Sequence, residues 1–411
     1  MSSKRTTGAR CPDTLYSQNP MSVRANIIFS ISIVCSVFAT ENNANANNRE
    51  LLAVIASTDG TDEADQAASK AVRQLQSLPS TEITDVLSGF NDASQRGRNW
   101  LRALAADVAD NGEFPESELL KFFNDRSGDA DARYVAFQLL VGNDNDAKAK
   151  LLANAATDPS LPVRYLKIQS LIDAAEKQKD ESPGEAKETL QQVVQNARSA
   201  NQLEKATAML SDLGVKVDLA DTLGMMTQWW AIGPFDNTDS KNFDTEYTPE
   251  QRYLESGSPI ATTGPGEPQT EKGKDGQPVT WLRIDSDDKL GMVDLNAPLK
   301  NAKDATAYVY CRFSTDSESA DFEAQIRLGC ITANKVWVNG KLVTSNEVYH
   351  SGSRIDQYVA PCTLSKGENT VMIKVLQNAQ TEPWAQDYQF QFRLTRPDGS
   401  PVKTSVIEPK Q

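Results

Sequence analysis

Histidine is almost missing from the sequence, since His350 is the one imidazole in 411 residues. This excludes most metal sites that use several histidine ligands, and it leaves one candidate base for a Ser-His-Asp type of triad. Cysteine is also scarce, with five residues and no CxxC spacing, which argues against a zinc site and a disulfide framework. No P-loop, dinucleotide-binding fingerprint or HExxH motif occurs. We therefore expect a protein that is not an enzyme and needs no metal or cofactor.

Basic residues are outnumbered, with 42 Lys and Arg against 56 Asp and Glu and a formal net charge of −14. Nucleic-acid binding is excluded, because a phosphate partner needs a basic surface. The excess of negative charge keeps the chain soluble, and we expect a monomer. Hydrophobic residues make up 39% and charged residues 24%, which is typical of a globular protein, and the length suffices for two or three domains.

Residues 1–46 have the pattern of a leader and signal peptide. Arg24 precedes an apolar run over 27–39, and residues 44–46 form a small-x-small cleavage motif. The run of 13 residues is about 20 Å long as a helix, too short to span a bilayer of about 30 Å. We expect a secreted or periplasmic protein with no membrane attachment after cleavage, and an uncleaved anchor is the alternative. Three cysteines would remain, enough for one disulfide and one free thiol.

Residues 49–224 are expected to be helical, because apolar residues recur at spacings of three and four and Gly or Pro separates the segments. The expected helices lie near 49–57, 62–77, 81–88, 95–109, 116–124, 130–141, 145–156, 162–176, 185–199 and 202–213.

A loose internal repeat runs through this region. Similar helix openings occur at 131–136 and 161–166, and residues 98–101 occupy the corresponding place one unit earlier. A period of 31–35 residues with two helices per unit is typical of an α-solenoid. The Asp-Pro turn and the Val-Arg-Tyr opening resemble HEAT repeats; another helix-pair array or an irregular bundle are the alternatives. We expect the arginine shared by these openings to bond carbonyl groups of the adjacent unit.

Residues 225–400 are expected to form an antiparallel β-sandwich of the jelly-roll type. Residues 307–313 and 322–328 alternate between apolar and polar side chains, and Asn339-Gly340 is a strong signal for a tight hairpin turn. Further strands are expected at 354–359, 370–377 and 388–395. Short strands at this spacing, with no helix between them, are typical of a sandwich. We expect residues 401–411 to be a disordered tail, and Trp229 and Trp230 to pack at the junction of the two halves.

Several segments of this half resemble a known family. Residues 336–341, 367–371 and 374–375 look like the galactose-binding-like jelly roll, in particular the sugar-binding domain of family 2 glycoside hydrolases. Residues 230–237, together with 243–250, are similar to a leader found in secreted multi-module bacterial proteins, common in planctomycetes and Bacteroidetes. The resemblance implies the fold and a role in sugar binding. A domain of this kind also often supports a neighbouring domain without binding anything itself.

Calcium-dependent relatives carry an Asp pair in the loop before the Val-Trp strand, where carboxylates supply ligands for Ca²⁺. Residues 329–334 of this chain, Gly-Cys-Ile-Thr-Ala-Asn, contain no carboxylate, so we expect no calcium site of that kind. The acidic segment 285–288 is expected to be a solvated loop.

The candidate ligand-binding residues lie in loops of the β half. Trp384 precedes the final strand in a polar loop, where an aromatic face suits sugar stacking, although inward packing is the alternative. Tyr349, His350 and Arg354 share the connection after the hairpin, and His350 is either a ligand contact or an ordinary surface residue. We expect none of these residues to be catalytic.

These observations predict a secreted or periplasmic non-catalytic binding protein. Its helical repeats would bind another protein, and its jelly roll would attach to a polysaccharide or cell-surface glycan. Two alternatives remain open: a structural scaffold that binds no sugar, and an accessory component of a carbohydrate-active enzyme system.

Overall fold

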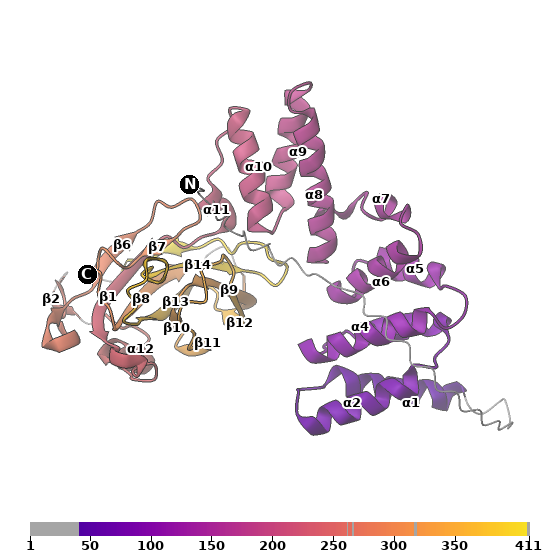
Figure 1. Ribbon diagram of the computed structural model, residues 1–411, viewed down its shortest axis with the longest axis horizontal. Coiled ribbons are helices and arrows are strands. Elements are labelled where there is room, and N and C mark those ends of the chain that lie inside the picture. Colours follow the sequence, from indigo (N-terminus) through magenta and orange to yellow (C-terminus); the bar gives the residue numbers. More distant parts are fainter. Residues whose placement is uncertain (1–40, 261, 265–266, 316–318, 409–411) are drawn as a thin grey trace, which may run out of the picture. The chain divides into compact units, whose positions relative to one another are not determined.

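The computed structural model describes residues 41–260, 262–264, 267–315 and 319–408. An N-terminal helical region is followed by a C-terminal antiparallel β domain, which confirms the predicted fold class (Figure 1). The apolar run and basic residue of the predicted signal peptide lie outside the described residues.

The helical region follows the predicted boundaries within a few residues for most helices. Local signals start several of these helices. Thr61 caps one of them by accepting a hydrogen bond from the Ala64 amide, and Pro183 is the first residue of another. The helices are α1 (Glu41–Ala56), α2 (Asp62–Leu75), α3 (Ile83–Ser88), α4 (Gln95–Ala109), α5 (Glu116–Asn124), α6 (Ala130–Asn143), α7 (Ala147–Leu151), α8 (Leu161–Gln178), α9 (Pro183–Asn196), α10 (Ala200–Asp212) and α11 (Leu219–Leu223).

Side-chain hydrogen bonds join successive helical units at a regular distance along the chain. Ser94 donates to the Thr58 carbonyl 36 residues away, Arg98 donates to Asp129 31 residues away, and Gln202 donates to the Tyr165 carbonyl 37 residues away. These separations of 31, 36 and 37 residues are close to the period of 31–35 residues expected from the helix openings. Each unit is therefore fixed to its neighbour in sequence by polar contacts as well as by apolar packing.

Arg133 is the most deeply buried cation of this region, with 1% of its surface exposed. Its guanidinium donates to the carbonyls of Phe123 and Asp125 and pairs with Asp158 at 2.6 Å. Arg164, at the equivalent place in the next unit, donates to the Asp158 carbonyl at 2.7 Å. The expectation that these arginines bond carbonyl groups is confirmed, but the carbonyls lie six to ten residues earlier in the chain and not a whole repeat away; Asp158 contacts both Arg133 and Arg164.

We expect Asp158→Ala to lower the free energy of unfolding by about 3–5 kcal/mol, because it leaves the buried Arg133 guanidinium without its counter-charge. Chemical denaturation followed by circular dichroism would measure this change. Arg96→Gln, which removes the exposed pair with Asp65, is the control and should have little effect. Equal losses in the two variants would contradict the assigned importance of the buried pair.

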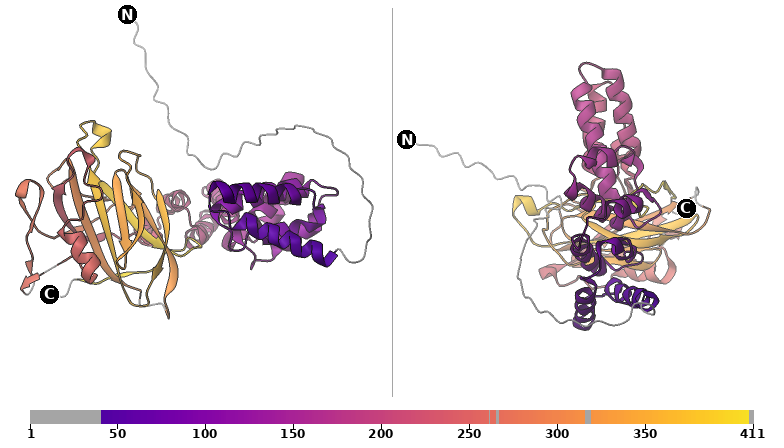
Figure 2. Two further views of the ribbon diagram at one scale, coloured as in Figure 1. Left: turned by 90° about the horizontal axis from the view of Figure 1, so that it is seen from below. Right: turned by 90° about the vertical axis from the view of Figure 1, so that its right-hand side faces the viewer.

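The β domain contains two antiparallel sheets (Figures 1 and 2). One sheet has the order β11-β10-β13-β8-β1-β6, with β15 also on β8, and the other has the order β12-β9-β14-β7. The strands are β1 (Gln228–Asp236), β6 (Leu282–Asp285), β7 (Val293–Asp294), β8 (Ala305–Ser314), β9 (Phe322–Cys330), β10 (Ala333–Val338), β11 (Lys341–Asn346), β12 (Tyr358–Leu364), β13 (Glu368–Gln377), β14 (Gln389–Thr395) and β15 (Ser405–Val406). Two short pairs, β2 (Thr262–Gly264) with β3 (Glu267–Pro268) and β4 (Glu271–Lys272) with β5 (Pro278–Val279), lie outside these sheets.

The predicted hairpin turn is confirmed. β10 and β11 pair on either side of Asn339 and Gly340, whose φ angles are 51° and 76°. Both central residues of this tight turn need positive φ, which Asn and Gly adopt most readily.

The core between the two sheets is apolar and includes Trp229, which is fully buried. Its indole ring packs edge-to-face with the rings of Phe390 and Phe392, and the ring centroids are 5.2 and 5.6 Å apart. Trp230 lies in a different cluster, against the other face of the same sheet. Because successive side chains of a strand point to opposite faces, the two tryptophans belong to two cores of the β domain, and not to the junction of the two halves where we expected them.

A second apolar cluster covers the outer face of the larger sheet, and it is built largely from aromatic residues around α12 (Thr248–Ser256), a helix not expected from the sequence. Beside it, the buried ammonium of Lys374 lies 3.3 Å from the Glu250 carboxylate and donates to the carbonyls of Phe243 and Thr245. The Tyr308 hydroxyl donates to the same carboxylate at 2.6 Å. These contacts fix α12 and the chain before it on the sheet.

We expect Glu250→Gln to destabilise the protein by about 3–5 kcal/mol, because Lys374 would stay buried without a counter-charge. Burial already lowers the pKa of Lys374, and the Glu250 carboxylate opposes that shift. Denaturation followed by tryptophan fluorescence would test the expectation. The double variant Glu250→Gln/Lys374→Met should recover most of the loss; no recovery would mean that the pair is not the cause.

Residues 401–408 correct another expectation. They do not form a disordered tail, because Ser405 and Val406 pair with Ser314 and Phe313 at the end of β8 and Val402 is buried in the sandwich core. β1 pairs with β8 only as far as Tyr310, so the last residues of β8 offer an open edge that the C-terminal segment fills.

Candidate functional site

The structure places Tyr349 and His350 together at one end of the sandwich. Tyr349 packs against the apolar cluster of Phe243, Ala333 and Leu376, and its hydroxyl accepts a hydrogen bond from the buried Asn237 side-chain amide at 3.0 Å. Burial raises the pKa of Tyr349. The contacts tie Tyr349 into the packing of the domain, so they give it a structural role.

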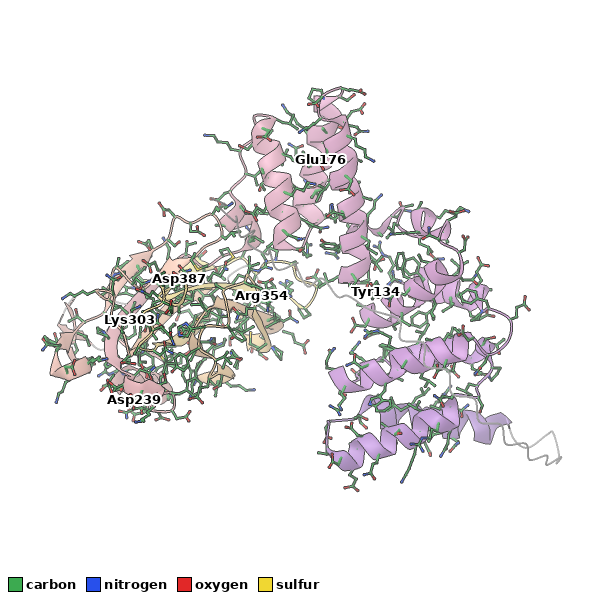
Figure 3. The ribbon with its side chains drawn as sticks, viewed as in Figure 1. Tyr134, Glu176, Asp239, Lys303, Arg354 and Asp387 are labelled. Carbon is green, nitrogen blue, oxygen red and sulfur yellow. The ribbon has the colours of Figure 1, made fainter. Side chains whose placement is uncertain are left out.

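His350 has a positive φ of 60°, and its Nε2 lies 2.7 Å from the Asn378 side-chain oxygen. This contact joins the 347–357 connection to the loop that carries Trp384 in the short turn Pro383–Ala385. The side chain of Trp384 lies outside the described residues. Arg354 is exposed and is labelled in Figure 3. The structure thus brings Tyr349 and His350 together, and no described contact brings Arg354 to them.

Asp356 holds the 347–357 connection against the smaller sheet. Its carboxylate accepts hydrogen bonds from Arg393 at 2.8 and 2.5 Å and from Arg327 at 3.1 Å. Burial would raise the pKa of Asp356, but the hydrogen bonds and charges of Arg393 and Arg327 outweigh it, so the pKa is lowered. Three of the predicted site residues, Tyr349, His350 and Arg354, therefore lie on a connection that is anchored by ion pairs.

A lowered folded-state pKa means that Asp356 stabilises the protein above the unfolded Asp pKa of about 3.9, and that this stabilisation disappears as the pH falls through the folded-state value. We expect Asp356→Asn to lower the free energy of unfolding by about 2–3 kcal/mol at neutral pH, because the hydrogen bonds from Arg393 and Arg327 lose their charged acceptor. Asn tolerates the positive φ of 57°, so the substitution adds no backbone strain. The difference from the wild type should shrink below about pH 4. Unfolding free energies across this range would test it, and a difference independent of pH would contradict it.

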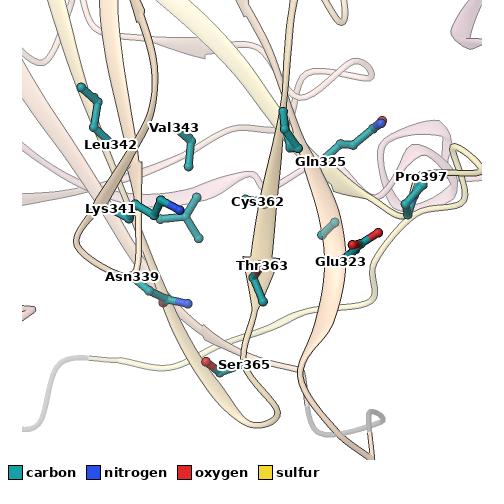
Figure 4. Close-up of a pocket in the computed structure, with 13 residues that line it drawn as sticks. Glu323, Gln325, Asn339, Lys341, Leu342, Val343, Cys362, Thr363, Ser365 and Pro397 are labelled. Carbon is teal, nitrogen blue, oxygen red and sulfur yellow. The ribbon is translucent and has the colours of Figure 1, made fainter. Parts of the chain in front are cut away.

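A depression of the β domain lies elsewhere, beside β11 and β12, the outermost strands of the two sheets. We name it the edge groove; its volume is about 830 Å³. In Figure 4, Lys341, Leu342 and Val343 lie on one side of β12, and Glu323, Gln325 and Pro397 lie on the other. The lining residues are Glu323, Ala324, Gln325, Val338, Asn339, Lys341, Leu342, Val343, Pro361, Cys362, Thr363, Ser365 and Pro397.

One end of the edge groove is held rigidly. The Asn339 side chain donates to the Asn369 side-chain oxygen at 2.8 Å and accepts from the Thr370 amide at 2.8 Å. The Asn369 amide group donates in turn to the Ser365 carbonyl at 2.8 Å. The hairpin turn and the β12–β13 turn are therefore locked together before any ligand arrives.

The lining combines hydrogen-bonding groups with apolar surface. Glu323 and Lys341 are exposed, and in the part of the chain that the structure describes neither takes part in an ion pair. Gln325 and Thr363 add an amide and a hydroxyl, while Leu342 is an apolar side chain with 47% of its surface exposed. Such a lining suits a ligand that has hydroxyl groups and C–H faces. Sequence reasoning missed this site: alternation predicts which side chains face outward, but not that β11 and β12 lie at the edges of two different sheets.

The three cysteines outside the leader are free thiols. Burial raises the pKa of Cys311 and of Cys330 to about 12 and that of Cys362, in the edge groove, to about 11. All three are therefore protonated at neutral pH, which makes them weak nucleophiles.

The described residues contain no group of three or more His, Cys, Asp or Glu placed to hold a metal ion. In the acidic segment 285–288, Asp288 accepts hydrogen bonds from the Leu290 and Met292 amides, and Asp285 pairs with Arg283. Among the described helices, none is long and apolar enough to cross a membrane. Comparison with protein-family models and with curated proteins found no match to this chain.

Proposed function

We propose that the protein is a non-catalytic binding protein whose β domain holds carbohydrate in the edge groove. The observation that carries the proposal is the groove itself: about 830 Å³ of space beside two edge strands, with polar side chains distributed along its walls. Ligand sites of this size commonly pair a few polar groups with apolar surface.

The chemistry of the lining favours a sugar over an apolar ligand. Sugar hydroxyl groups donate and accept hydrogen bonds at once, so they suit a lining that offers an ammonium group on Lys341, a carboxylate on Glu323 and an amide on Gln325. Leu342 and Val343 provide apolar surface for the C–H faces of a sugar ring. The resemblance of 336–341, 367–371 and 374–375 to sugar-binding jelly rolls supports the same assignment.

The signal-peptide pattern of residues 1–46 supports a secreted or periplasmic location. Repeated helical units present a continuous surface, which favours a protein partner for residues 49–224. A scaffold without sugar binding is the competing function, and the groove variants below separate the two.

We expect Lys341→Ala and Gln325→Ala each to weaken binding to a retained polysaccharide by about tenfold, because a hydrogen bond worth about 1.4 kcal/mol is lost. Affinity electrophoresis and pull-down on insoluble glycans would measure the change. Lys366→Ala is the matched control, since Lys366 is exposed in the β12–β13 turn and does not line the groove.

Unchanged melting temperatures in these variants would show that the loss is one of binding. If Trp384→Ala abolishes retention while Lys341→Ala does not, the site lies in the loop before β14. If the wild type is retained on no glycan, the scaffold function is favoured.

A further inference from the structure

A second depression lies on the other side of the Asn339–Gly340 turn. We name it the turn pocket; its volume is about 450 Å³. It lies between the end of α12 and the ends of β8 and β13. The lining residues are Ser256, Gly257, Ser258, Ile260, Tyr310, Arg312, Asn339, Glu368, Asn369 and Thr370.

The turn pocket and the edge groove share a wall. Asn339 lines both, the β12–β13 turn contributes Ser365 to the groove, and the start of β13 contributes Glu368 to the pocket. The Tyr253 hydroxyl of α12 bonds the Thr370 hydroxyl at 2.9 Å and accepts from the Gly340 amide at 3.1 Å. The helix that borders the pocket is thus bonded to the turn that separates the two depressions, so both keep a fixed relative position.

Charges cancel within each depression. The edge groove has one cation, Lys341, and one carboxylate, Glu323. The turn pocket has one cation, Arg312, which forms an ion pair with its one carboxylate, Glu368. The chain as a whole carries a formal charge of −14, which repels polyanions at long range. Neither depression offers the surplus of positive charge that would overcome this repulsion.

We propose that the β domain binds an internal stretch of an uncharged polysaccharide that crosses the Asn339–Gly340 turn, so that sugar units occupy the edge groove and the turn pocket together. This inference rests on the proposed function, because it assigns the class of sugar held by the same edge groove. The serine hydroxyls at the end of α12 and the Thr370 hydroxyl provide the polar contacts of the second subsite.

The test is a length series measured by calorimetry on the whole protein. Uncharged glucose, mannose and xylose oligosaccharides from disaccharide to octasaccharide are the probes, with alginate and hyaluronate as acidic comparators. We expect at least about a tenfold gain in affinity once the oligosaccharide is long enough to reach both depressions, since the second contact becomes intramolecular. The acidic polymers should bind at least about tenfold more weakly.

Ser256→Trp is designed to fill the turn pocket from an exposed position, and Ser345→Trp, also exposed but outside both linings, is its control. We expect Ser256→Trp to remove the gain with length while leaving disaccharide affinity unchanged. An affinity independent of length, or a gain that survives Ser256→Trp, would overturn the crossing; equal or tighter binding of the acidic polymers would overturn the uncharged class. In each of these cases groove binding itself stands, whereas the absence of binding by any probe would overturn both proposals.

Discussion

The arrangement of the β domain depends on neutralising one buried lysine. Lys374 lies in β13, an inner strand of the larger sheet, and its side chain has no exposed surface. An ammonium group can stay charged there only if a carboxylate and other oxygen atoms replace water. Glu250 and two carbonyls supply them, and all three come from the segment between β1 and β6. The lysine thus selects which part of the chain covers this face of the sheet.

The position of α12 in turn determines part of the surface of the β domain. α12 is positioned by Glu250 at its first turn and by the Tyr253 hydroxyl near its end, so its C-terminal residues border the turn pocket. The smaller sheet covers the opposite face of the larger one, and its edge strand β12 borders the edge groove. Each face of the larger sheet is therefore covered by an element that also helps to form one of the two depressions.

Most of the regular elements could be predicted from local patterns. Apolar periodicity located α2, α4 and α5 almost to the residue, and Asn339-Gly340 located the hairpin, because these signals act over a few residues. The exceptions depend on distant partners. α12 is held by Lys374, 124 residues after Glu250, and β15 forms because β1 leaves the end of β8 unpaired.

The candidate site was the hardest feature to predict for the same reason. Polar loops drew attention to Tyr349 and His350, yet both are occupied in bonding neighbouring segments, with Asn237 lying 112 residues before Tyr349. The edge groove carries no local motif. Its walls combine β9 and β12, which pair in the smaller sheet, with β11 and the β10–β11 turn at the edge of the larger sheet, and only the packing of the two sheets makes them neighbours.

The pairing of β15 also sets an order of events during synthesis. Helical units whose contacts span little more than thirty residues can form as they leave the ribosome, one after another. The larger sheet is different, because Val402 enters its core and residues 405–406 complete β8. The core of the sandwich is therefore complete only when residues 402–406 have folded onto it, whereas the polar contacts of each helical unit lie within little more than thirty residues of sequence.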